Sequence, residues 1–132
     1  MRNNLHHVHL YASDIDATIR FYCELFGGEV VFDQELAGAR NVFVRVGTGR
    51  LHLYDQPPRS PGRGSIHHFG IQTDDIEALV ARLRERDIPL KKEVTELGAW
   101  RYVMVPAPDD VLVEVFEVDL GSLPEPFRGY FD

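Results

Sequence analysis

The sequence predicts an α+β fold built from two tandem βαβββ modules, and three observations support this prediction. A shift that carries His6 onto His67 aligns "LHHVHLYASDID" (5–16) with "IHHFGIQTDDIE" (66–77), which indicates an internal duplication. Each copy starts with a short alternating run, continues with a helical period and ends in segments rich in β-branched and aromatic residues. The stretch 55–65 between the copies is rich in Pro, Gly and Ser and has no hydrophobic period, as is typical of a linker.

The first module is predicted to span residues 5–54. A strand at 5–12 precedes a helix that Ser13 or Asp14 caps and that the pair Gly27 and Gly28 ends. The apolar face of this helix is predicted to consist of Ile15, Ile19, Tyr22 and Phe26. Three strands are predicted to follow, at 29–36, 41–46 and 50–54, with "GTG" as the turn between the last two.

The second module, residues 66–118, is predicted to repeat this order. A strand at 66–73 leads into a helix at 75–87, whose inward residues are predicted to be Ile76, Leu79, Val80 and Leu83. Strands are expected near 89–96, 100–106 and 111–118, with "PAPDD" as the last turn. The tail 119–132 contains two prolines and three aromatic residues, so we expect an extended segment on an apolar surface, with a role between subunits left open.

Composition excludes several classes of protein. The chain has 21 acidic and 14 basic residues and a net charge of −7, which opposes binding to nucleic acid. No apolar run approaches the roughly 18 residues of a membrane span. Cys23 is the single cysteine and the N-terminus has no apolar signal segment, so neither an internal disulfide nor export is expected. We therefore expect a cytoplasmic protein that binds a small molecule.

Strand alternation places potential metal ligands on the side of each sheet that faces away from its helix. His7, His9 and Tyr11 share one face of the first strand, whereas His6, like His67 in the second copy, is expected on the helix side or at the edge as a structural residue. The same rule places further residues on the helix-distant faces: His52, Tyr54, His68, Gln72, Glu114 and Phe116.

The candidate ligands occupy equivalent positions in the two modules. His7 and His52 lie on the first and last strands of module one, and His68 and Glu114 lie on the same strands of module two. If each sheet curls into a half-barrel and the two half-barrels face one another, these four donors meet at one point. Three imidazoles and one carboxylate leave a divalent ion with net positive charge, able to bind a substrate oxygen or acidify water.

Three stretches together resemble the vicinal oxygen chelate superfamily, which includes glyoxalase I, methylmalonyl-CoA epimerase, extradiol dioxygenases, and fosfomycin and bleomycin resistance proteins. They are "HVHLYASDIDATIRFYCELFGGEVV", "IHHFGIQTDDIEALVARLRERDI" and "DDVLVEVFE", within residues 5–118. The resemblance implies one glyoxalase-like domain over 1–132, usually a homodimer. It also implies one divalent ion per site, Ni, Co, Zn, Mn or Fe, with His7, His68 and Glu114 at the usual ligand positions.

The fourth ligand position departs from the resembled enzymes. His52 stands where glyoxalase I has a glutamate and the epimerase a glutamine, which removes one candidate base. Glu35 precedes His52 by 17 residues, a spacing that resembles that of the epimerase's catalytic glutamate. Tyr11 replaces the arginine that bacterial glyoxalase I uses for glutathione, and His9 replaces a threonine of the fosfomycin enzymes.

The expected activity is that of a metal-dependent lyase or isomerase that chelates a small oxygen-rich substrate and stabilises an enolate-like intermediate. The candidate proton carriers are Glu114, Glu35 and His9. The candidate substrate-binding residues are Tyr11, Arg45, Tyr54, Gln72 and Phe116.

Two other functions remain open at this stage. Two histidines and a glutamate also match the ligand set of Fe(II) dioxygenases of the extradiol type. A protein that sequesters a drug or toxic metabolite is the other alternative. The sequence also leaves open whether the metal ligands come from one chain or from two chains of a dimer.

Overall fold

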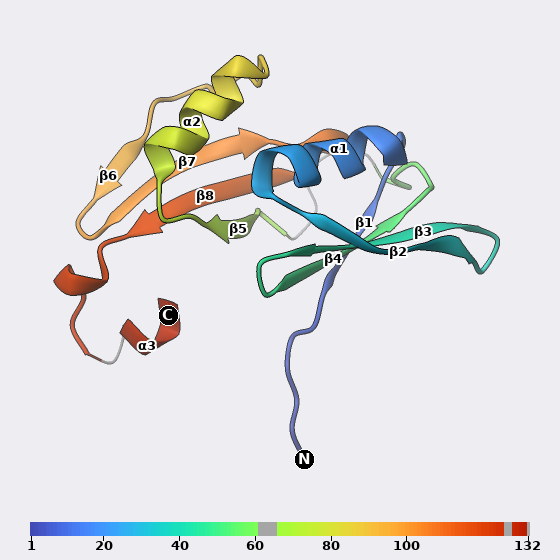
Figure 1. Cartoon of the computed structure of the whole chain (residues 1–132), viewed down its shortest axis with the longest axis horizontal. Coiled ribbons are helices and arrows are strands. Elements are labelled where there is room, and N and C mark those ends of the chain that lie inside the picture. The colour runs from blue at the N-terminus through green and yellow to red at the C-terminus, as the bar shows by residue number, and fades with distance from the viewer. Residues whose placement is uncertain (61–65, 126–127, 132) are drawn as a thin grey trace. The chain divides into compact units, whose positions relative to one another are not determined.

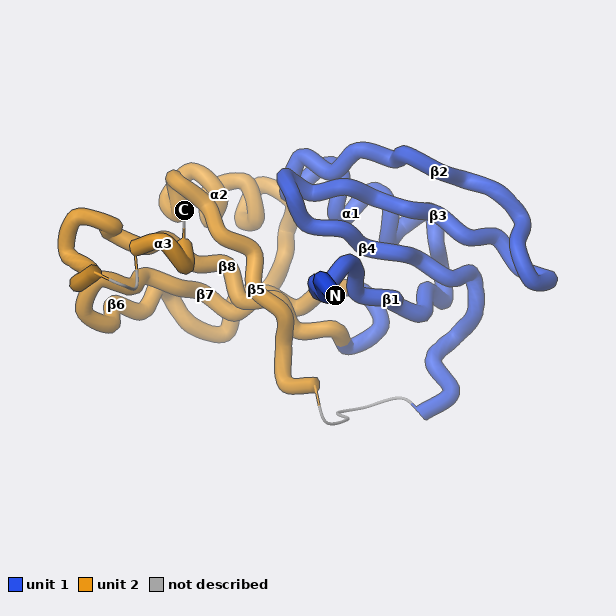
Figure 2. The backbone as a smooth tube through the Cα atoms, turned by 90° about the horizontal axis from the view of Figure 1, so that it is seen from below, with its two compact units in different colours: residues 1–62, 108–110 blue, residues 63–107, 111–132 orange. Residues whose placement is uncertain are grey.

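The computed structural model describes residues 1–60, 66–125 and 128–131, and divides into two compact units. Unit 1 comprises Met1–Gly62 with Pro108–Asp110, and unit 2 comprises Arg63–Ala107 with Val111–Asp132 (Figure 2). The predicted linker, 55–65, lies partly outside the described residues, because 61–65 are not among them. The predicted module bounds and the single-domain assignment stay predictions.

Unit 1 has the predicted βαβββ order (Figure 1). Its sheet has the strand order β1-β4-β3-β2, in which β1 runs parallel to β4 and the other pairs are antiparallel. The first strand is shorter than predicted because it begins at Val8 rather than at residue 5. The elements are β1 (Val8–Tyr11), α1 (Ile15–Phe26), β2 (Glu29–Leu36), β3 (Ala39–Val46) and β4 (Gly49–Tyr54).

Helix α1 begins and ends at the predicted residues. The Asp14 side chain accepts a hydrogen bond from the backbone N–H of Ala17 at 3.0 Å, and Gly27 closes the helix in the left-handed region with φ of 67°. The predicted apolar face is confirmed at Ile15 and Tyr22, whereas Ile19 and Phe26 are only half-buried. The buried residues are Ile15, Thr18, Phe21, Tyr22 and Leu25.

The core of unit 1 lies between α1 and one face of its sheet. Val42, Val44, Leu51 and Leu53 are all buried on that face. Gly28 allows the helix to approach the sheet closely, because a Cβ there would lie 2.8 Å from Cγ1 of Val44. The opposite face therefore carries the side chains of the intervening strand positions.

Unit 2 repeats the architecture, with the strand order β5-β8-β7-β6 and β5 parallel to β8. The buried residues of its first helix are the four that were predicted. The strand predicted near 89–96 has only three residues, Thr95–Leu97, and so lies at the end of that range and one residue past it. The predicted helix 75–87 ends two residues early. The elements are β5 (Phe69–Gln72), α2 (Ile76–Glu85), β6 (Thr95–Leu97), β7 (Trp100–Pro106) and β8 (Leu112–Val118).

The last three residues of the "PAPDD" turn predicted in module two belong to unit 1. Residues Pro108–Asp110 form a 3-10 turn, η1, and the carboxylate of Asp109 accepts hydrogen bonds from the backbone N–H and the hydroxyl of Ser13. These bonds attach the turn to the start of α1. No helix among the described residues is long and apolar enough to cross a membrane.

The C-terminal tail was predicted to be extended, but this prediction is wrong. The tail forms the 3-10 turn η2 (Leu120–Ser122) and the short helix α3 (Arg128–Phe131). Its apolar contact is as predicted. The ring of Phe131 meets that of Trp100 edge-on, with centroids 5.0 Å apart, and lies 6.1 Å from that of Phe116. The tail therefore covers part of the helix-distant face of the unit 2 sheet.

Candidate metal and substrate site

Two predicted metal ligands lie against each other in unit 1. The imidazoles of His7 and His52 are stacked, with centroids 3.7 Å apart and planes inclined by 13°. Phe43, the partner of His52 in the β3–β4 register, stacks on His52 with the same spacing. Burial and, to a smaller extent, the nearby imidazoles lower the pKa of His52 below its ordinary value. The neutral form that can bind a metal is therefore favoured at this position.

Other predicted site residues of unit 1 surround this stack. His9 pairs in register with His52 on the neighbouring parallel strand, and its ring lies 5.9 Å from that of His52. The Tyr54 ring meets His9 edge-on at 5.8 Å, and Tyr11 lies 6.1 Å beyond Tyr54. The strands β1 and β4 thus gather these predicted residues on one face.

His6 belongs to the same cluster, which the sequence did not predict. Its Nδ1 lies 3.1 Å from Nδ1 of His7, and the ligand atoms of His6, His7 and His52 all lie within 4.8 Å of one another. Of the two positions expected for His6, the helix side or the edge, the helix side is wrong, because β1 begins at Val8 and strand alternation does not extend to His6.

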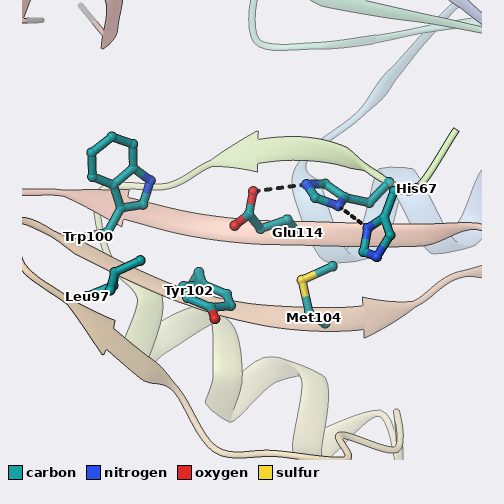
Figure 3. A pocket seen from close by; sticks show the side chains of 7 residues that line it. His67, Leu97, Trp100, Tyr102, Met104 and Glu114 are labelled. Carbon is teal, nitrogen blue, oxygen red and sulfur yellow. Dashed lines mark hydrogen bonds and ion pairs between the residues drawn. The ribbon is translucent and has the colours of Figure 1, made fainter.

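Unit 2 places its two predicted ligands in contact. Nε2 of His68 lies 3.3 Å from a carboxylate oxygen of Glu114, which projects from β8 beside Gly70 of β5 (Figure 3). Nδ1 of His68 lies 2.7 Å from Nδ1 of His67. His67 was expected on the helix side or at the edge. It precedes its strand, as His6 does, and lines the pocket described next. The His-His pair that recurs in both copies of the sequence could have indicated the contact between His67 and His68.

A pocket of about 470 Å³ opens on the helix-distant face of unit 2. One end is polar, with the two histidines and Glu114, and the other end is walled by apolar and aromatic side chains (Figure 3). The lining residues are His67, His68, Leu97, Trp100, Tyr102, Met104 and Glu114. The apolar wall was not predicted, because it depends on the register that places Met104 opposite Glu114.

Two predicted substrate-binding residues of unit 2 contact the tail. The side-chain amide of Gln72 donates a hydrogen bond to the carbonyl oxygen of Phe131 at 3.0 Å, and Phe116 is near the Phe131 ring. Both lie on the same sheet face as Glu114. In unit 1, Arg45 lies on the histidine face by register but forms an ion pair with Glu29 at 2.6 Å.

Glu35 is not brought to the histidine cluster of unit 1. It pairs in register with Arg40, whose guanidinium binds Asp16 on α1 and Asp33 on β2. Glu35 therefore lies on the helix side of the sheet, opposite His52. The sequence spacing that suggested a catalytic role does not determine the face, which follows from the register of Glu35 with Arg40 and of Phe43 with His52.

The donor atoms suit a borderline transition metal. Imidazole nitrogen binds Zn, Cu, Ni or Fe, and a carboxylate extends the range toward Mn. Unit 1 offers the nitrogens of His7 and His52, and unit 2 offers His68 with Glu114. In each unit, one donor lies one residue before the first strand and the other lies on the last strand.

Two βαβββ units with such donor side chains on the helix-distant faces define a class of duplicated α+β proteins. The model of the Glyoxalase/Bleomycin resistance protein/Dioxygenase superfamily matches residues 4–115. The chain belongs to this superfamily, as the resemblance in the sequence indicated.

Relatives with known names include two kinds of enzyme. The chain is 30% identical over 106 residues to the mitochondrial methylmalonyl-CoA epimerase of Bos taurus. This match covers 72% of this chain and 61% of the epimerase. It is 27% identical over 131 residues to a lactoylglutathione lyase of Arabidopsis thaliana, covering 92% of this chain and 46% of the lyase. The chain thus spans less than two thirds of both relatives.

Solved structures support the fold. Lactoylglutathione lyase from Agrobacterium tumefaciens superposes with a TM-score of 0.66 at 26% identity, covering 88% of this chain and 94% of the lyase. A mutant of the fosfomycin resistance protein FosX from Listeria monocytogenes, in complex with Mn(II) and 1S,2S-dihydroxypropylphosphonic acid, gives 0.78 at 17% identity. The match covers 92% of this chain and 97% of FosX, and it shows the fold alone.

Proposed function

We propose that this chain is a divalent-metal-dependent enzyme of the lyase or isomerase type, which moves a proton on a carbon next to a carbonyl of a small oxygen-chelating substrate. The observation that carries the proposal is the recurrence of one donor pair per unit. His7 lies against His52 in unit 1, and His68 lies 3.3 Å from Glu114 in unit 2. Membership of a superfamily with epimerase and lyase relatives supports the reaction class.

The four donors hold one ion in this proposal. An ion held by them supplies positive charge that stabilises negative charge developing on a substrate oxygen. His7, His52 and His68 act as neutral imidazoles and Glu114 as a carboxylate, which leaves net positive charge for an anionic oxygen. The pKa of His52, lowered by burial, favours its neutral form in this role.

His9 is the proposed proton carrier. It lies on the same face as His52 in register, is exposed, and is flanked by the ring of Tyr54. An imidazole can both accept and donate a proton through its two ring nitrogens, as a proton carrier must. Glu35 is not proposed because it lies on the other face of its sheet.

The unit 2 pocket is the proposed place for the rest of the substrate. Trp100, Tyr102 and Met104 wall it beside Glu114, so an apolar substituent packs there while polar oxygens lie at the histidine end. Tyr11 in unit 1 supplies a further hydroxyl. A small substrate that combines two oxygens with an apolar part fits these surroundings.

Hydrogen exchange into substrate tests the reaction class. The chain, loaded with Zn²⁺, Ni²⁺, Co²⁺ or Mn²⁺, is incubated in D2O with methylmalonyl-CoA, lactoylglutathione and a panel of small 2-hydroxy and 2-oxo acids. NMR should show deuterium entering next to the carbonyl, and chelation should abolish the exchange. His9→Asn should lower the rate about 100-fold or more with unchanged metal content. Exchange that is indifferent to chelation would contradict the proposal.

A sequestering role is favoured by one observation, the mainly apolar wall of the pocket. Tight binding of an apolar compound that persists after chelation, with no turnover, would support it in place of the enzyme. Oxygen uptake with catechols by the Fe(II)-loaded chain would instead indicate a dioxygenase. Each outcome excludes proton transfer as the main activity.

The proposal leaves open whether one chain or the two chains of a homodimer supply the four ligands. Mixing a His7→Ala chain with a His68→Ala chain separates the two arrangements. If the ligands come from two chains, part of the metal content returns on mixing, because one of the two sites then has all four ligands. If one chain supplies them all, mixing restores nothing.

A further inference from the structure

We infer that unit 1 carries a transition-metal site of its own, in which His6 is the third ligand beside His7 and His52. Their ligand atoms all lie within 4.8 Å of one another. No second group of three His, Cys, Asp or Glu ligand atoms lies as close together in 1–60, 66–125 and 128–131. The site uses two donors of the proposed enzyme site, but it requires neither His68 nor Glu114.

The distances suit one small cation after modest ring rotations. Two nitrogens bound to a tetrahedral zinc at 2.0–2.1 Å lie about 3.4 Å apart. The Nδ1 atoms of His6 and His7 are already 3.1 Å apart, with room for one proton between them. A cation takes the place of that proton.

The three histidines differ in burial, and this difference favours their binding of one ion. His52 is half-buried and held between the rings of His7 and Phe43. His6 and His7 are exposed and precede the first strand, so their rings can turn without breaking the β1–β4 ladder. The fixed imidazole therefore provides the anchor, and the two exposed ones complete the site.

The chemistry of the site follows from its donors. Three imidazoles without a carboxylate favour Zn, Cu or Ni over Mg, Ca or Mn. Three histidines also leave a fourth position open for water or a small anion. Because His7 and His52 belong to both sites, only one of the two sites is occupied at a time. In the site of the proposed function, His68 and Glu114 take the place of His6.

The test removes the unit 2 donors from the full chain. A His68→Asn/Glu114→Gln variant is titrated with Zn²⁺ alone by calorimetry, with circular dichroism as the check on folding. We expect one equivalent of zinc per chain, bound through nitrogen ligands in the X-ray absorption spectrum. Adding His6→Asn should weaken zinc at least about tenfold. Adding His67→Asn, the equivalent residue of the other unit, is the matched control and should change nothing.

Two results would overturn the inference. One is loss of all zinc binding when the unit 2 donors are removed, and the other is equal affinity with and without His6. If the double variant does not fold, either single variant replaces it, since each leaves unit 2 with only one of its two donors. The inference rests on two ligands of the proposed function, but the two can fail separately. If metal binding by the natural chain depends on Glu114 and not on His6, the proposed enzyme site stands and the separate unit 1 site is refuted.

Discussion

The imidazole of His52 stacks on that of His7, with ring centroids 3.7 Å apart and planes inclined by 13°. Parallel pairing of β1 with β4 produces this contact between residues 45 positions apart in the chain. Two neutral rings stack without cost, whereas two protonated rings repel one another. The contact therefore links the protonation of unit 1 to its stability.

The metal-free protein should lose stability in mild acid because of His52. Burial, assisted by the nearby imidazoles, lowers the pKa of His52 in the folded chain below its unfolded value of about 6.5. The folded state then binds fewer protons, so this contribution is complete above about pH 6.5 and is lost as pH falls through the folded pKa. Urea unfolding between pH 5 and 8, with chelator present, measures it.

The His52→Gln variant is the control for that titration. Gln keeps a polar side chain at this position but does not titrate, so the variant's stability should depend less on pH in the same window. A curve that keeps the slope of the natural chain would show that another group carries the pH dependence.

A second pH effect should come from the ion pairs that link α1 to its sheet. Arg40 binds Asp33 through two hydrogen bonds of 2.8 Å and reaches Asp16 of α1. The hydrogen bond from Arg40 lowers the pKa of Asp33, so its contribution exists above about pH 4 and is lost as pH falls through the folded pKa. Asp33→Asn should destabilise the protein at pH 7 but not near pH 2.5.

Asp74→Asn, at an exposed position before α2, is the matched control for Asp33→Asn. It should leave the stability nearly unchanged at both pH values. An equal loss for the two variants would show that net charge, rather than the Arg40 contact, determines the effect.

The tail should be detectable through the single tryptophan of the chain, Trp100. Phe131→Ala removes the edge-on contact at 5.0 Å, so the emission of Trp100 should shift to the red. Unit 2 should lose about 1 kcal/mol of stability, the usual worth of such a pair. Tyr130→Ala, 81% exposed and next in sequence, should change the emission little. An unshifted spectrum for Phe131→Ala would contradict the packed tail.

The core of unit 1 should depend on Leu53. This side chain is fully buried between β4 and α1, so Leu53→Ala should lower the free energy of unfolding by about 2–5 kcal/mol. Leu97→Ala, 66% exposed, should cost less than about 1 kcal/mol. Chemical denaturation compares the two, and a similar loss for both would contradict the assigned core.

Element order was predictable because local signals determine it. Asp14 and Asp75 cap their helices in equivalent ways, and each accepts from the backbone N–H three residues later. Part of the face of α1 was missed because Thr18 is buried, which an apolar pattern does not reveal. Its hydroxyl donates to the carbonyl oxygen of Asp14 at 3.1 Å, which satisfies the buried polar group.

The candidate site was predictable for residues within a strand, and also for His7 and His68, which lie one residue before theirs. His9 and His52 follow strand alternation, and Glu114 does so in unit 2. His6 and His67 precede the first paired residues of their strands, so alternation could not place them. The facing of Glu35 depended on the β2–β3 register, which is a feature of pairing between strands rather than of one strand.

A double-mutant cycle on zinc affinity tests the central claim most directly. The natural chain, His7→Ala, Glu114→Ala and the variant with both substitutions are titrated under identical conditions. If one ion binds residues of both units, each single substitution should weaken the same binding step, and the two effects should be strongly non-additive. Two separate binding steps, each lost with only one of the substitutions, would contradict a shared ion.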